Sequence, residues 1–175
     1  MWFCRLIEAA SGREYFDLLQ ERVLGPLKLS DVRPADRSII PRIATGYHRG
    51  GPNLRDDGRM KFDPSSEWTG GGLVTTPTML VRFYAALAEG RVPQPESFRQ
   101  MLEGGWRDPG ATSHYDLGVF VDGGRNAFGH GGMWPGYRTD VTHFLDRGIT
   151  VAVQTNTDQS IDTEYLMDRI AALME

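Results

Sequence analysis

The segment from Phe128 to Tyr137, Phe-Gly-His-Gly-Gly-Met-Trp-Pro-Gly-Tyr, is the part of this 175-residue chain best suited to chemistry. Glycine lets a ligand approach the main chain closely, and the histidine between glycines adds a hydrogen-bond donor or a positive charge. Backbone N–H groups beside an imidazole can stabilise an oxygen anion, as acyl transfer requires. We therefore take His130 as a candidate site residue. The structural alternative is a histidine that stabilises a tight turn.

Acyl transfer also needs a nucleophile and a base, and neither is evident in the chain. None of its serines is followed three residues later by lysine, and none of its tyrosines is followed two residues later by asparagine. Ser66 or Ser113 acting with His130 is an alternative catalytic arrangement, but the sequence places no acid beside it. Trp134 and Tyr137 lie near the end of this segment and border the expected hairpin, where they could form an apolar wall for a substrate or simply pack the turn.

Other candidate residues favour structural roles. Gly70-Gly71-Gly72 precedes a helix, but a phosphate-binding loop would also need a lysine that is missing here. Cys4 lies on an apolar helical face, which indicates a buried, inert thiol. His143 alternates with Val141 along a strand and is expected on a sheet face. No histidine pair has metal-site spacing, so we predict no metal and no cofactor.

Composition narrows the classes of function. The net charge is −4 and the pI is about 5.6, so a nucleic acid or an anionic membrane is not an expected partner. The single cysteine allows no internal disulfide. No apolar stretch is long enough to span a membrane, and the first residues do not resemble a secretory signal. The compartment stays open.

Hydrophobic periodicity predicts helices in the first part of the chain, then strands, then a closing helix. The helices are expected at 1–11, 13–24, 76–90, 95–102 and 162–174, and the strands at 115–121, 137–145 and 149–155. The region 26–74 is expected to be a long loop with one short hairpin around Tyr47 and Phe62. The closing helix is expected to bury Leu166, Ile170 and Leu173. This order indicates an α+β fold.

Three segments in the right order resemble the serine β-lactamase-related family, which includes class C β-lactamases, D-Ala-D-Ala carboxypeptidases and β-lactamase-like esterases. The first is Ile7 to Phe16 with Val23-Leu24-Gly25-Pro26-Leu27. The second is Gly70-Gly71-Gly72-Leu73-Val74-Thr75-Thr76. The third is Asn126 to Asn156, which contains the histidine segment and Val-Ala-Val-Gln-Thr-Asn. The resemblance implies the β-lactamase/transpeptidase-like fold, an antiparallel sheet with a C-terminal helix and a helical region.

The resemblance also implies a mechanism in which a serine attacks a carbonyl and forms an acyl-enzyme. A lysine three residues after the serine and a Tyr-x-Asn motif assist it, and a third motif lines the site on a strand. His130-Gly131-Gly132 matches that third motif. By the same match, the backbone N–H of Met133 is one oxyanion donor, and the nucleophilic serine supplies the other.

The Ser-x-x-Lys and Tyr-x-Asn motifs would both lie upstream of Met1. We therefore expect residues 1–175 to form a single β-lactamase-related domain whose nucleophile-bearing part is missing, with no activity alone. A small-molecule acyl substrate would bind once the missing half is supplied, but lactam, peptide, ester and amide are not distinguished. A non-catalytic module that binds a ligand or partner is the alternative. The incomplete sheet is also expected to expose an edge and an apolar face that promote homodimers.

Overall fold

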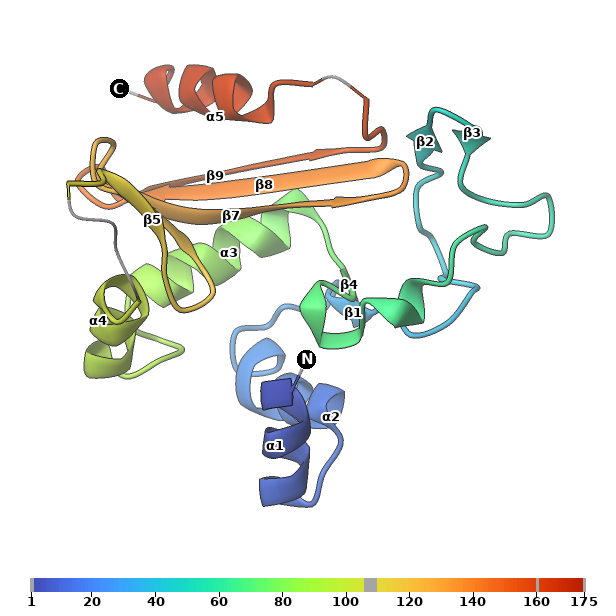
Figure 1. Ribbon diagram of the computed structural model, residues 1–175, viewed down its shortest axis with the longest axis horizontal. Coiled ribbons are helices and arrows are strands. Elements are labelled where there is room, and N and C mark those ends of the chain that lie inside the picture. The colour runs from blue at the N-terminus through green and yellow to red at the C-terminus, as the bar shows by residue number, and fades with distance from the viewer. Residues whose placement is uncertain (1, 106–109, 160, 175) are drawn as a thin grey trace.

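The computed structural model describes residues 2–105, 110–159 and 161–174. In this part of the chain, a five-stranded antiparallel sheet has the order β5-β6-β7-β8-β9, with helix α5 on one face and α3 on the other (Figure 1). The sheet strands are β5 (Ser113–Tyr115), β6 (Phe120–Asp122), β7 (Ala127–Trp134), β8 (Tyr137–Phe144) and β9 (Ile149–Thr155). The helices are α1 (Trp2–Ser11), α2 (Tyr15–Leu19), α3 (Pro77–Ala88), α4 (Pro95–Glu103) and α5 (Thr163–Ala172). The α+β prediction is confirmed.

Helix α3 begins where the sequence predicts. The Thr76 hydroxyl accepts a hydrogen bond from the Met79 N–H at 3.4 Å, and Pro77 occupies the first turn, where its missing N–H costs nothing. Gly90 follows the helix with a φ of +68°, a left-handed conformation that favours glycine. The helix packs its apolar stripe beneath the sheet.

Each face of the sheet has its own apolar cluster. Under α3 the buried members are Tyr84, Leu87, Val119, Phe128 and Val141, with Phe98 of α4 packed against them. Under α5 they are Ala127, Phe144, Val151, Met167 and Ala171. Adjacent residues of β7 and β8 therefore alternate between the two clusters, as strand geometry requires. Helices α3 and α5 thus cover the two faces of the C-terminal strands. The prediction that these strands expose an apolar face is therefore wrong.

The segment predicted as one strand, 115–121, is a hairpin. Strands β5 and β6 pair with each other, and the Asp116 N–H donates to the carbonyl oxygen of Val119 at 2.8 Å to close the turn. Gly118 has a φ of +83°, which an L side chain would strain. Turn chemistry at Leu117-Gly118 therefore outweighs the apolar run on either side of it.

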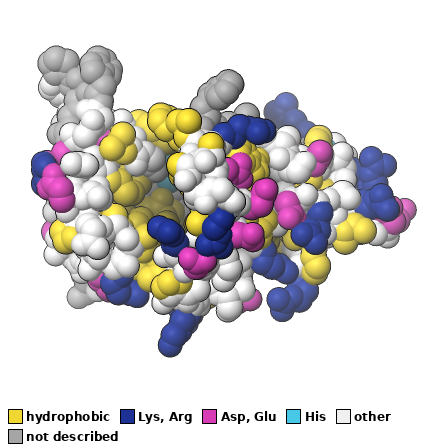
Figure 2. All heavy atoms as spheres, turned by 90° about the horizontal axis from the view of Figure 1, so that it is seen from below, with side chains coloured by type: hydrophobic (Ala, Val, Ile, Leu, Met, Phe, Trp, Pro, Cys, Tyr) yellow, Lys and Arg dark blue, Asp and Glu magenta, His cyan; other side chains and the backbone are white. Residues whose placement is uncertain are grey.

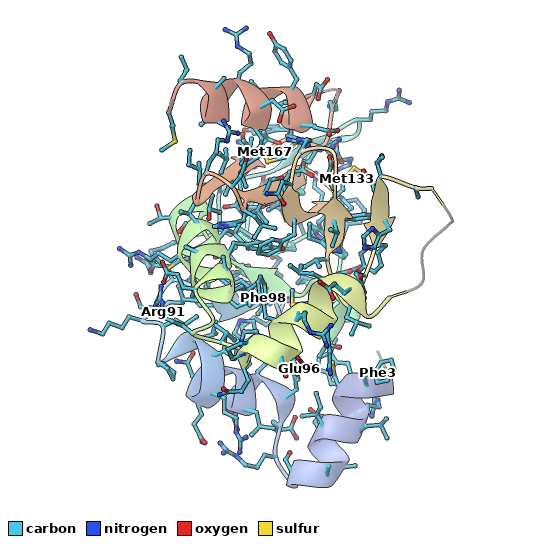
Figure 3. All side chains as sticks on the ribbon, turned by 90° about the vertical axis from the view of Figure 1, so that its left-hand side faces the viewer. Phe3, Arg91, Glu96, Phe98, Met133 and Met167 are labelled. Carbon is cyan, nitrogen blue, oxygen red and sulfur yellow. The ribbon has the colours of Figure 1, made fainter. Side chains whose placement is uncertain are left out.

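Helix α5 docks with a different face from the one predicted. Leu166, Ile170 and Leu173 are all more than a third exposed. The helix instead buries Thr163, Met167 and Ala171, and Figure 3 shows Met167 on the side that faces the sheet. The Thr163 hydroxyl donates to the carboxylate of Asp140 on β8 at 2.5 Å, and the Asp162 carboxylate caps the helix. This polar anchor at its first residue fixes the rotation of the helix.

The region 26–74 has little regular structure. Strand β2 (Tyr47–His48) pairs with β3 (Gly51–Pro52), and β1 (Arg33–Pro34) pairs with β4 (Leu73–Val74). The hairpin predicted around Tyr47 exists, but its partner strand is not at Phe62. That ring instead packs against His48, with ring centroids 5.2 Å apart.

The N-terminal helices are less buried than the rest. Helix α1 exposes the apolar side chains of Phe3, Leu6 and Ile7. Cys4 is half-buried rather than buried. The second predicted helix, 13–24, is present as α2 followed by a π-helical turn over Gln20–Leu24. No helix in the described ranges is long and apolar enough to cross a membrane.

Candidate functional site

Strand β7 divides its backbone groups between two neighbours. Its register with β8 is continuous from Ala127 to Trp134, and the bond from the Leu145 N–H to the Asn126 oxygen extends that register by one pair. Because hydrogen-bonded and non-bonded pairs alternate, the even-numbered residues of β7 bond to β8. The backbone N–H and C=O groups of Gly131 and Met133 therefore point away from β8.

The edge to which these groups point is only partly covered. Strand β6 pairs with β7 from Ala127 to Gly129 and stops there. Along Gly131 and Met133, no strand among the described residues pairs with this edge of β7. Main-chain donors and acceptors at such an edge can bind another extended group.

His130 lies where that coverage ends. Its Nδ1 is 2.6 Å from the carbonyl oxygen of Gly131, and its Nε2 is 3.2 Å from the hydroxyl of Tyr115. The ring of Phe120 also contacts it, with centroids 5.3 Å apart. The imidazole is half-buried, held by one backbone bond and by two aromatic residues of the β5–β6 hairpin.

The two glycines after His130 serve different purposes. A Cβ at Gly131 would lie 2.2 Å from Oδ1 of Asp140, so a side chain there would displace the carboxylate that anchors α5. A Cβ at Gly132 would meet nothing within 4 Å, so the space beside its main chain is open. The Met133 side chain is 71% exposed at the same end of the strand (Figure 3). A ligand can therefore approach the main chain at this point.

The surface that carries α1 is hollowed. Figure 2 shows hydrophobic side chains gathered around a hollow between the N-terminal helices and the end of the molecule that holds α4 and the β5–β6 hairpin. Exposed apolar side chains from the elements bordering it include Phe3 and Leu6 of α1, and Leu117 and Phe120 of the hairpin.

Trp134 and Tyr137, the two residues predicted to wall the substrate site, face each other as the last pair before the β7–β8 turn. The Tyr137 hydroxyl donates to the Ala44 carbonyl oxygen at 2.5 Å. Partial burial raises the pKa of Tyr137. The indole N–H of Trp134 is buried with no hydrogen-bond partner in the described structure. These contacts show that Tyr137 holds a neighbouring loop, and a contact with substrate stays a prediction.

Asn53 holds the same loop, and sequence reasoning missed it. The side chain is fully buried; its Oδ1 accepts from the Gly46 N–H and its Nδ2 donates to the Pro135 carbonyl oxygen, both at 2.9 Å. Gly46 and Gly136 touch so closely that a Cβ at Gly46 would lie 2.5 Å from the Gly136 oxygen. The asparagine follows a Gly-Gly-Pro turn, a signal that indicates a loop but not its docking site.

The remaining candidate residues are engaged in packing or in hydrogen bonds away from His130. The Ser66 hydroxyl donates to the Asp63 carbonyl oxygen, and neither Ser66 nor Ser113 has a hydrogen bond to His130 in the described structure. Gly72 packs so tightly that a Cβ would lie 2.3 Å from the Trp68 oxygen. His143 lies on a face of β8 as predicted, where it packs against the Phe128 ring, is buried, and has its Nδ1 2.7 Å from the Thr150 hydroxyl.

An antiparallel sheet with helices on both faces is the architecture of the β-lactamase and transpeptidase-like enzymes. The Beta-lactamase family matches residues 2–174, and the chain belongs to that family. D-aminopeptidase from Brucella canis is 25% identical in an alignment 171 residues long, which covers 96% of this chain and 32% of that protein. The chain spans about a third of the length of the curated relatives it matches.

Solved structures agree on the fold. A D-stereospecific amidohydrolase from a Streptomyces species superposes with a TM-score of 0.76 at 26% identity, covering 92% of this chain and 49% of that one. A penicillin-binding protein from Bacillus halodurans superposes with a TM-score of 0.73 at 21% identity, covering 95% of this chain and 51% of that one. The resemblance seen in the sequence is confirmed at the level of family and fold.

Proposed function

We propose that this chain is the C-terminal part of an acyl-transferring serine hydrolase and is inactive alone. His130, Gly131 and Gly132 line the acyl site, and the Met133 N–H is one donor of the oxyanion hole. The nucleophilic serine, its lysine and the Tyr-x-Asn motif belong to a preceding segment of the same domain. No residue of this chain matches those motifs.

The uncovered edge of β7 carries this proposal. The Met133 N–H points away from β8 and lies beyond the last residue that β6 pairs with, while the space beside Gly132 is open. An oxyanion hole needs backbone donors fixed by the fold and reachable by a carbonyl oxygen. The β7–β8 ladder fixes this donor, and the glycine leaves room for a substrate.

We propose an amide bond beside a D-configured residue as the substrate. Two relatives support this choice, because one is named D-aminopeptidase and another D-stereospecific amidohydrolase. Trp134 and Tyr137 would form the apolar wall on the side of the β7–β8 turn. Lactam and ester substrates are the alternatives that a substrate panel would separate.

The chain alone provides the first test. A fluorophosphonate probe and a D-alanine p-nitroanilide should give neither a covalent adduct nor turnover, because the nucleophile is absent. An adduct mapped to Ser66 or Ser113 would contradict the proposal and favour an independent enzyme. Specific binding of D-amino acid amides that never leads to turnover, even with the preceding segment supplied, would favour a non-catalytic binding module.

The second test uses the chain joined to the segment encoded upstream of it. Met133→Pro removes the proposed donor without breaking the ladder to β8, and should lower kcat by about 100-fold to 1,000-fold. Met133→Ala keeps the N–H and is the matched control, with activity near that of the parent. Equal activities of the two variants would remove the Met133 N–H from the mechanism.

We also propose that the isolated chain forms homodimers through β9. This strand ends the sheet, and its seven residues contain no charged side chain that would discourage pairing. The β5–β6 hairpin lies at the opposite end of the sheet and does not shield it. In the completed enzyme, the preceding segment could cover the same edge.

A further inference from the structure

The protonation of His130 follows from its two hydrogen-bond partners. A carbonyl oxygen only accepts, so Nδ1 must carry a proton to bond the Gly131 oxygen at 2.6 Å. In the neutral ring, Nε2 is then an acceptor. The Tyr115 hydroxyl, 3.2 Å away, must be the donor of the second bond.

The β5–β6 hairpin holds Tyr115 from its other side. The neighbours of Tyr115 in sequence, His114 and Asp116, turn away from it and are buried, with Nε2 of His114 3.1 Å from Oδ2 of Asp116. Oδ1 of Asp116 accepts from the Leu117 N–H at 3.1 Å. Tyr115 itself is half-exposed and packs edge-on against Phe120, with ring centroids 4.7 Å apart. A buried ionisable pair thus fixes the backbone that carries an exposed phenol.

We propose that Tyr115 is a positioning residue of the His130 site. Its hydroxyl donates to Nε2 and, together with the Gly131 oxygen, keeps the neutral imidazole in the Nδ1–H form with Nε2 as an acceptor. Any effect of Tyr115 on substrate binding or turnover rests on the proposed function. A nitrogen held in this form suits a substrate that offers a hydrogen-bond donor, such as an amide N–H, in place of the phenol.

The chain as it exists is sufficient for the test, because the readout is the imidazole itself. Long-range ¹H–¹⁵N correlation spectra of the ¹⁵N-labelled protein report which ring nitrogen carries the proton, and His130→Gln assigns the signals. Above pH 8 we expect His130 to be mainly Nδ1–H. In Tyr115→Phe we expect the Nε2–H form to gain at least a several-fold larger share, with the Nε2 resonance shifted.

Tyr165→Phe is the matched control, because it removes the hydroxyl of an exposed tyrosine on α5 that has no contact with His130 among the described residues. Its tautomer populations should match those of the parent. A parent His130 that is mainly Nε2–H would overturn the proposal, and so would a Tyr115→Phe spectrum identical to the parent.

The tautomer measurement and the test of the proposed function can fail independently. The tautomer is measured without turnover, so a completed protein that fails to hydrolyse amides would defeat the function and leave this inference intact. In an active completed enzyme, Tyr115→Phe should lower kcat/KM by about 3-fold to 10-fold, the loss expected for one neutral hydrogen bond. An unchanged kcat/KM would contradict its role toward substrate.

Discussion

The sheet with α3 and α5, and the loop from Ala44 to Asn53, are held to the molecule by different forces. The sheet buries an apolar cluster on each face. The loop docks on the β7–β8 turn through Asn53, the Tyr137 hydroxyl and a glycine-to-glycine contact. Apolar burial is spread over many side chains, whereas the loop depends on a few hydrogen bonds. The loop is therefore more sensitive to the loss of a single polar group.

The largest effect should come from the apolar cluster under α3. Phe128 is 1% exposed and contacts the rings of Tyr84, Phe98 and His143. Phe128→Ala should lower the free energy of unfolding by about 3–5 kcal/mol, because it removes buried contacts and leaves a cavity. Urea denaturation measures the change. Phe3→Ala on exposed α1 is the control and should change stability by less than about 0.5 kcal/mol.

Asn53→Ala should cost about 2 kcal/mol, because the Gly46 N–H and the Pro135 oxygen each lose a buried partner. Exchange of the Tyr47 amide proton, which bonds the Asn156 oxygen, should accelerate as the loop releases. Asn156→Ala removes a more exposed bond to the Thr45 oxygen and should have a smaller effect. Equal effects would show that burial of Asn53 does not set the strength of docking.

Sheet pairing can be tested at the β9 edge. Even-numbered residues of β8 bond to β9, so Gln154 directs its backbone N–H outward. Light scattering at tens of micromolar should show a dimer or larger species for the parent chain. Gln154→Lys places a charge on the edge and should shift the chain toward the 19.6 kDa monomer. A monodisperse parent monomer would exclude edge pairing.

The smallest effect concerns pH and the apolar cluster. Burial lowers the pKa of His143 below its ordinary 6.5, although Glu89 opposes the shift. The unfolded chain then binds a proton at this histidine more readily than the folded chain does. The stability that the neutral, buried His143 contributes is therefore fully present above pH 6.5 and decreases as the pH falls below 6.5. The loss of stability between pH 7.5 and pH 5.5 should be smaller in His143→Gln than in the parent. A larger loss in the variant would show that folding does not lower the pKa of His143.

The sequence predicted most elements whose structure local chemistry decides, although it missed the turn at Leu117-Gly118. Thr76-Pro77 specified the start of α3, and the Ile149, Val151, Val153 alternation specified β9. It failed where tertiary contacts decide. The rotation of α5 depends on Thr163 meeting Asp140, two residues 23 positions apart in the chain. Strand β7 was not evident from its composition, because its glycines lower strand propensity and only neighbouring strands compensate for them.

The candidate site follows the same uneven pattern. The glycine flanks of His130 indicated close approach to the main chain, and the structure has open space at Gly132. At Gly131, a side chain would instead meet the Asp140 carboxylate of the neighbouring strand, a contact that no local sequence pattern reveals. Tyr115 was expected inside a strand and not beside the histidine, because its contact depends on a turn at Gly118 that brings the hairpin back to β7.

The two-residue turn at Pro135-Gly136 limits how this region can change by insertion. Gly136 has a φ of +87° and touches Gly46, so the turn is constrained by both its length and its neighbour. One added residue would shift the β7–β8 pairing and exchange inward and outward groups along the strand. The length of the 135–136 turn should therefore stay fixed among relatives of this protein.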